Sequence, residues 1–174
     1  MKKRLMLLFC VFTVVLFAGC DAGVLSDTGV PTELVGTWTL DTQVDKETYT
    51  SYTTTTTQTG TIRITEDGAF SLTQTGDYVS VPNTATANSG TRKTVYEYSG
   101  TCFGKPQSES NWGYVSLVFS SQKTTKSGTG SLISPDYPGN PVTETHSDKY
   151  TDGFTYYVSQ NKAYISNIGS FTRN

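Results

Sequence analysis

The segment TIRITEDGAFSL constrains the fold more than any other, because apolar and polar side chains alternate on both sides of a glycine. Such alternation is typical of strands with one buried face. A two-residue turn would place polar residues opposite the core. A three-residue loop that ends at Gly68 pairs Ile62 with Leu72. It also pairs Ile64 with Phe70. The strand register must keep the apolar side chains on one face. We therefore predict the three-residue loop, with the backbone of Gly68 in the left-handed conformation.

Strand and turn composition continues through the rest of the chain. Thr, Ser, Gly and Tyr dominate beyond the N-terminal segment, Leu and Ala are scarce, and no window has a useful helical apolar period. In NWGYVSLVFSS, Val115, Leu117 and Phe119 share one face. We expect further strands at 33–41, 94–101 and 128–133, and a short one at 78–81.

Several weaker patterns complete the expected fold. FTYYVSQNKAYIS predicts a hairpin about Asn161-Lys162, with Val158 opposite Ile165. The repetitive run YTTTTTQTG is expected to form a solvated edge strand with a weakly specified register. VPNTATANSG and SPDYPGNPVTETHSD are predicted polar loops. Seven or eight strands joined by hairpins predict an all-β domain over residues 33–174: an antiparallel up-and-down barrel of about eight strands, with a β-sandwich as the alternative.

The N-terminus has the pattern of an export signal. Three basic residues precede an uncharged apolar run, 5–18, which is too short for a permanent membrane span. The run ends in LFAGC, which resembles the lipobox of bacterial lipoproteins. The resemblance implies a signal peptide at 1–19 and acylation of Cys20. Residues 20–32 would then form a lipidated tether.

The acyl chains would hold the domain to a membrane, because each buried methylene contributes about 0.8 kcal/mol. We therefore expect a lipoprotein of the bacterial cell envelope, partnered with the membrane through its N-terminus. Asp21 follows the acylated cysteine. It does not decide between the inner and outer membranes, because the rule for that position differs between bacteria.

The motif Gly36-Thr37-Trp38, followed by the Gly68 hairpin, resembles small bacterial lipocalin-like lipoproteins. In the lipocalin family this tryptophan closes the base of the barrel under an arginine near the last strand. The resemblance therefore implies a structural pair between Trp38 and Arg173. Thr151-Asp152 is similar to part of a second lipocalin motif.

Charge and cysteine content exclude several functions. Removal of the signal peptide would leave 10 basic and 15 acidic residues, a formal net charge of −5, without a basic cluster. Nucleic acid is therefore not an expected partner. The mature chain would keep only Cys102 besides the acylated cysteine, so no intramolecular disulfide could form. We interpret Cys102 as a small buried apolar residue; the alternative is a reactive thiol near Lys105.

No catalytic motif is recognisable. Glu144, His146 and Asp148 are spaced two residues apart, as metal ligands on one face of a strand would be. We interpret them instead as solvated charges of a loop. Asp77 and Glu97 could form a glycosidase-like pair only at a separation that sequence cannot predict. We therefore predict a non-enzymatic protein without a metal or cofactor.

The predicted inward positions are bulky and could either line a ligand cavity or fill the barrel. The leading hypothesis is a binding module for a small apolar or amphipathic ligand in the barrel mouth. The alternative is a structural or protein-interaction lipoprotein with a filled core, acting in adhesion, inhibition or envelope assembly. A transmembrane β-barrel fits the length but not a lipid anchor with polar loops. The candidate ligand-facing residues are Ile62, Ile64, Phe70, Leu72, Leu117 and Phe119.

Overall fold

The computed structural model describes residues 29–85, 89–106 and 112–174. The predicted signal peptide and Cys20 lie outside these residues. Ten strands and two short 3-10 helices make up the described chain. They are, in order, a helix at Thr32–Leu34, β1 (Gly36–Leu40), β2 (Gln43–Thr48), β3 (Tyr52–Ile64), β4 (Ala69–Pro82), β5 (Gly90–Lys105), β6 (Gly113–Gly128), a helix at Gly130–Leu132, β7 (Val142–His146), β8 (Tyr150–Ser159), β9 (Lys162–Ile165) and β10 (Gly169–Arg173).

Eight of the strands form a closed antiparallel barrel. Hydrogen bonding runs from β1 through β10, β9, β8, β6, β5, β4 and β3, and β3 pairs with β1 again. β1 and β2 pair with successive parts of β3, and β8 and β7 do the same along β6. The predicted up-and-down barrel is therefore confirmed, in a form consistent with a lipocalin-like barrel, and the sandwich alternative is wrong.

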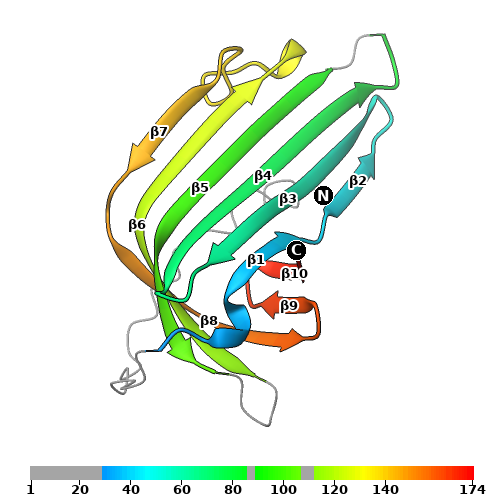
Figure 1. Ribbon diagram of the computed structural model, residues 1–174. Helices are drawn as coiled ribbons and strands as arrows, with labels where there is room; N and C mark the ends of the chain where they lie inside the picture. Colours follow the sequence, from blue (N-terminus) through cyan, green and yellow to red (C-terminus); the bar gives the residue numbers. More distant parts are fainter. Residues whose placement is uncertain (1–28, 86–88, 107–111) are drawn as a thin grey trace, which may run out of the picture.

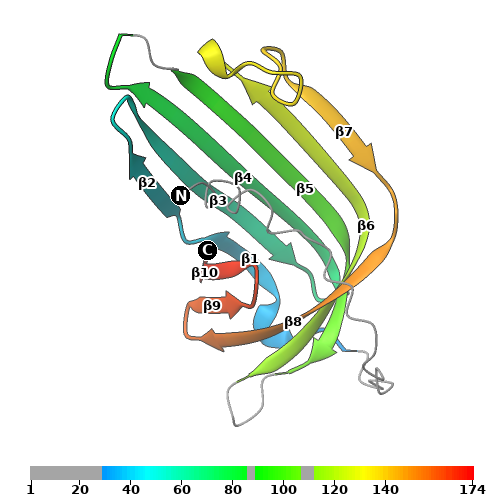
Figure 2. The ribbon, with the colours of Figure 1, turned by 180° about the vertical axis from the view of Figure 1, so that it is seen from behind.

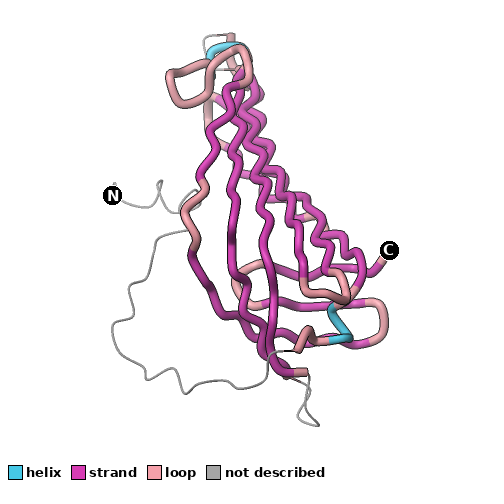
Figure 3. The backbone as a smooth tube through the Cα atoms, turned by 60° about the vertical axis from the view of Figure 1, so that its left-hand side comes forward, coloured by secondary structure: helices cyan, strands magenta, loops and turns pink. Residues whose placement is uncertain are grey.

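The barrel is closed along only half of its length. β3 to β6 have 13 to 16 residues each, whereas β1, β9 and β10 have four or five. The long strands therefore continue past the closed ring and form an open sheet with β2 and β7 at its edges (Figures 1 and 3). We call the concave face of this open sheet the trough, and the opposite end of the barrel the base.

The hairpin between β3 and β4 has the predicted register. Ile62 pairs with Leu72 and Ile64 with Phe70, and the intervening loop has three residues between Thr65 and Ala69. Gly68 has φ +84°, as its place in this loop requires.

Gly68→Ala is expected to lower the free energy of unfolding by about 1–3 kcal/mol. The new Cβ would be strained at this φ, and would lie 2.8 Å from the carbonyl oxygen of Cys102 and 3.0 Å from Val30. Chemical denaturation followed by circular dichroism measures the change. An unchanged midpoint would contradict the loop conformation.

The second predicted hairpin has a different register. Val158 pairs with Ala163, and Tyr156 with Ile165, because the turn lies at Gln160-Asn161 and Gln160 takes φ +54°. The predicted partner, Ile165, is two residues away. A shift of two residues leaves every side chain on the same face, so apolar alternation cannot distinguish the two registers.

Other predictions made from local sequence are corrected by the observed pairing between strands that are distant in the sequence. Residues 52–60 do not form the predicted edge strand, because β3 pairs with β2 on one side and with β4 on the other. The expected strand at 128–133 is a 3-10 helix after β6, and the expected strand at 33–41 begins only at Gly36. β7 lies within the predicted polar loop, where it pairs with the long β6.

The core fills the closed half of the barrel. All six predicted inward residues are buried, at 1–4% exposure. Trp38, Tyr156 and Phe171 are the bulkiest fully buried side chains and come from three different strands. Burial of each large apolar side chain contributes roughly 1.5–3 kcal/mol, so this half is the main source of stability.

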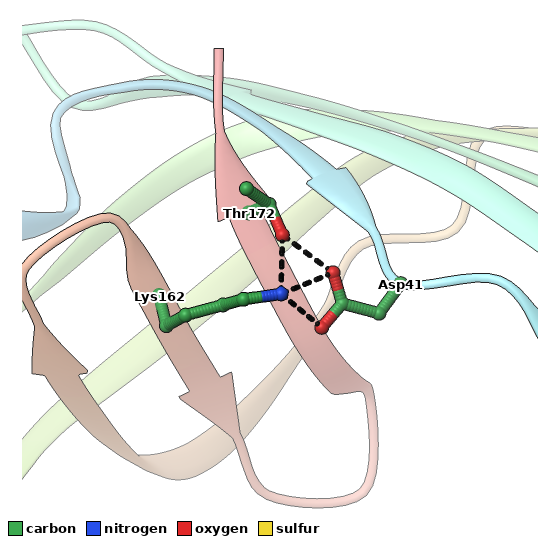
Figure 4. A network of polar contacts seen from close by, with 3 residues as sticks. All are labelled: Asp41, Lys162 and Thr172. Atoms are coloured by element: carbon green, nitrogen blue, oxygen red, sulfur yellow. Dashed lines mark hydrogen bonds and ion pairs between the residues drawn. The ribbon is translucent and has the colours of Figure 1, made fainter.

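A polar network on the outside ties the end of β1 to β9 and β10. The ammonium group of Lys162 donates to both carboxylate oxygens of Asp41, at 2.9 and 2.7 Å, and to the hydroxyl of Thr172 at 2.6 Å (Figure 4). Thr172 in turn donates to Asp41 at 2.6 Å. These donors, Lys162 foremost, lower the pKa of Asp41 below its ordinary value.

Asp41→Asn is expected to cost about 0.5 kcal/mol at pH 7, because the pair is exposed to screening by solvent. The folded-state pKa is the lower one. The contribution of the carboxylate is therefore present above the unfolded-state pKa, about 3.8, and lost as the pH falls through the lower folded-state pKa. Urea denaturation between pH 2 and 7 measures this slope. The difference between wild type and variant should shrink on acidification; a difference that stays constant from pH 7 to pH 2 would contradict the role of the Asp41 carboxylate.

Candidate functional site

The mouth of the closed barrel, where the interior meets the trough, is floored by aromatic rings. Phe119 lies at its centre and stacks on Tyr150, with ring centroids 4.5 Å apart. Phe70 and Tyr98 meet Phe119 edge to face, at 5.3 and 5.5 Å, and Tyr96 stacks on Tyr98. Such contacts contribute about 0.5–1.5 kcal/mol per pair beyond the burial of apolar area, so they stabilise this floor.

A small recess opens in this floor. Its volume is about 20 Å³, and it lies among Leu72, Gln74, Tyr98, Phe119 and neighbouring residues of β8 and the β9–β10 turn. A space of this size holds about one water molecule, whereas pockets for small ligands measure about 300–1,000 Å³. The recess can accept a protruding group of a ligand, but not a whole ligand.

The walls of the trough are polar. Side chains two residues apart on one strand share a face, so the inward series of each long strand continues upward from the buried core. On β4, Leu72 is followed on this face by Gln74 and Tyr78; on β5, Tyr98 is preceded by Tyr96 and Arg92. Four small hydroxyl residues on the same face are buried: Thr54, Ser80, Thr94 and Thr124.

Tyrosine hydroxyls in the trough remain protonated over the physiological range. Burial, and then the neighbouring Tyr150 and Tyr96, raise the pKa of Tyr98. Burial also raises the pKa of Tyr78, and that of Tyr150 with a further contribution from Asp152. These phenols are therefore neutral hydrogen-bonding groups beside an apolar floor.

The loop between β6 and β7 folds over the far end of the trough. The guanidinium of Arg92 lies 5.0 Å from the ring of Tyr137 and donates to the carbonyl of Leu132 at 3.4 Å. A second recess, of about 80 Å³, lies beside this loop, with Lys126, Asp136 and Glu144 on its rim. The trough thus has an aromatic floor at one end and a charged rim at the other.

The predicted contact between Trp38 and Arg173 is present at the base. The Arg173 guanidinium lies 4.5 Å from the centre of the Trp38 ring, and the two residues are neighbours across β1 and β10. Arg173 also donates to the carbonyls of Glu33 and Val35, both at 2.9 Å, while the indole of Trp38 donates to Leu34 at 2.9 Å. This end of the barrel is closed by packing.

The predicted tether overlaps with the folded domain. Pro31 is fully buried, Val30 packs against the core, and the carbonyl of Gly29 accepts a hydrogen bond from Gly104. The described chain is therefore packed on the barrel from Gly29, before the predicted boundary at residue 33.

Cys102 is buried, as predicted, at 4% exposure. Burial raises the pKa of its thiol to about 11, which disfavours the reactive thiolate. Asp77 and Glu97 lie on the convex face of the open sheet, where Glu97 pairs with Lys123 at 3.0 Å. They are outside the trough.

Glu144 and His146 are exposed on the edge strand β7, and Asp148 follows it. No group of three or more His, Cys, Asp or Glu side chains within residues 29–85, 89–106 and 112–174 could hold a metal ion. The same ranges contain no helix that is long and apolar enough to cross a membrane.

The trough was not predicted from the sequence. TVYEYSG alternates Tyr96 and Tyr98 with other residues and could have indicated an aromatic face. Its position above the barrel mouth depends on the pairing of β4, β5 and β6, which no local pattern specifies. No protein family, curated protein or solved structure among those compared matches this chain.

Proposed function

We propose that this protein is a membrane-anchored lipoprotein of the bacterial cell envelope and a non-enzymatic, lipocalin-like binding module. Its ligand is a small amphipathic molecule that lies in the trough, with its apolar part on the aromatic floor. The observation that carries the proposal is the contrast between the two halves of the barrel. The closed half is packed, whereas the open half presents aromatic and amide side chains on one concave face.

The trough supports an amphipathic ligand better than a purely apolar one. The half-buried rings of Tyr96 and Tyr150 offer apolar contact, and Gln74 borders the adjoining recess. Small-molecule sites combine an apolar surface with a few polar groups that set orientation. A wholly apolar ligand would desolvate the amide of Gln74 and the phenols without replacing their hydrogen bonds.

Native mass spectrometry of the β domain incubated with an envelope lipid extract tests this proposal. The expected result is a mass adduct that weakens by roughly tenfold in Tyr96→Ala, which removes one stacking partner worth about 1.4 kcal/mol. Val95→Ala is the matched control, because Val95 precedes Tyr96 on the same strand and points to the convex side. A bare mass at every lipid concentration would contradict ligand binding.

The alternative is a structural or protein-interaction lipoprotein, and the packed closed half favours it. Such a protein would use its outer surfaces in adhesion, inhibition or envelope assembly. It predicts no lipid adduct and no difference between Tyr96→Ala and Val95→Ala. Capture of a defined envelope protein that protects the convex face from hydrogen exchange would support it instead.

A further inference from the structure

Three aromatic side chains form an exposed cluster on the outside of the closed barrel. Trp112 is 50% exposed and Tyr164 43% exposed. The Trp112 ring lies 5.8 Å from that of Tyr157 and 6.1 Å from that of Tyr164, and the two tyrosines pair across β8 and β9. We call these three residues the aromatic patch. Large apolar side chains gathered on a surface, rather than scattered, indicate an interaction site.

The aromatic patch lies at the base, near the point where the chain enters the barrel. The carbonyl of Gly29 accepts a hydrogen bond from the amide of Gly104 at 2.9 Å. Gly104 pairs with Val115 on β6, and Trp112 is three residues before Val115. The beginning of β6 lies at the base, opposite the free end of the open sheet (Figure 2), and the end of β8 pairs with it there, Tyr156 with Gly113.

The length of chain before Gly29 limits how far the base can be from a membrane. Cys20, the proposed acylation site, precedes Gly29 by nine residues. Nine residues span at most about 30 Å when fully extended. As a flexible chain they would span about 15–18 Å on average. The base, and not the trough, would therefore be held beside the lipid surface.

We propose that the aromatic patch is a membrane-contact surface, through which the base rests on the lipid headgroups. This inference rests on the proposed lipid anchor. Tryptophan and tyrosine are enriched at membrane interfaces, because their rings enter the apolar boundary while the N–H or O–H group remains at the wet side. The trough, at the other end of β3 to β6, then faces away from the membrane and is open to soluble ligands.

Quenching by brominated lipid tests this contact on the full, acylated protein. The protein is reconstituted into phosphatidylethanolamine–phosphatidylglycerol vesicles with or without brominated acyl chains. Trp38 is only 1% exposed, so quenching reports Trp112. Emission is expected to fall in brominated vesicles for the wild type and to be unaffected in Trp112→Phe. The matched control adds Val81→Trp to Trp112→Phe, because Val81 is 55% exposed at the opposite end; its emission should not be quenched.

The mass of the N-terminal peptide separates failure of this inference from failure of the anchor. If Cys20 is acylated and Trp112 is not quenched, the membrane-contact surface is wrong and the lipoprotein proposal stands. If Cys20 carries no lipid, the proposed anchor fails and this inference fails with it. The membrane-contact surface would also be wrong if Trp112 became shielded from solvent only when the protein associated with a second copy or another protein, without quenching by brominated lipid.

Discussion

Trp38→Ala is expected to lower the free energy of unfolding by about 3–5 kcal/mol, the largest loss expected for a single core substitution in this protein. Trp38 is 1% exposed and is the largest fully buried side chain. Its removal leaves a cavity at the base, and the carbonyl of Leu34 loses its indole donor. The guanidinium of Arg173 also loses the ring on which it lies, a contact worth about 0.5–2 kcal/mol.

Urea denaturation followed by far-ultraviolet circular dichroism measures this loss. Trp112→Ala is the matched control, because it deletes the other tryptophan at a half-exposed position and should cost only about 1 kcal/mol, from its contacts with Tyr157 and Tyr164. Trp38→Phe should lie between the two. Equal losses for Trp38→Ala and Trp112→Ala would contradict a base closed by Trp38.

Gly100→Ala is expected to lower the free energy of unfolding by about 2–4 kcal/mol, because overpacking is combined with displaced ladder hydrogen bonds. A Cβ at Gly100 would lie 1.9 Å from the carbonyl oxygen of Val118 and 2.9 Å from the ring of Phe70. The pairing of β5 with β6 is also irregular between Ser99 and Gly100. The strands could separate here only by disturbing the floor of the trough.

Gly76→Ala provides the matched control for Gly100→Ala. Gly76 lies on β4 and a Cβ there would meet nothing within 4 Å. Its substitution should be neutral or stabilise by up to about 1 kcal/mol, because the unfolded chain loses freedom. Thermal unfolding of the two variants side by side measures the difference. A similar loss in both would show that close approach at Gly100 is not the cause.

The parts of the fold that local chemistry determines could be predicted from the sequence. The register of the β3–β4 hairpin follows from apolar alternation together with a single glycine, and Gly68 has the expected conformation. The β8–β9 hairpin could not be predicted in the same way. Its two candidate registers bury the same faces, and a positive φ at Gln160 decides between them.

The length of the strands and the shape of the trough depend on pairing between strands that are distant in the sequence. The threonine run at 53–57 has no buried apolar face of its own and lies inside the sheet because β2 and β4 both pair with it. The trough exists because the strands that close the ring are short, a property of β9 and β10 rather than of the residues that line it. The resemblance to lipocalins did indicate the contact between Trp38 and Arg173.

Photo-crosslinking with a diazirine-bearing monoacylglycerol distinguishes a ligand in the trough from a ligand inside the closed barrel. Adducts are mapped by peptide mass spectrometry after irradiation of the folded protein. We expect labels on the concave residues of β4 and β5, between Gln74 and Tyr78 and between Arg92 and Tyr96. Labels on Trp38 or Val115, deep in the closed half, or no labels at saturating probe, would contradict it.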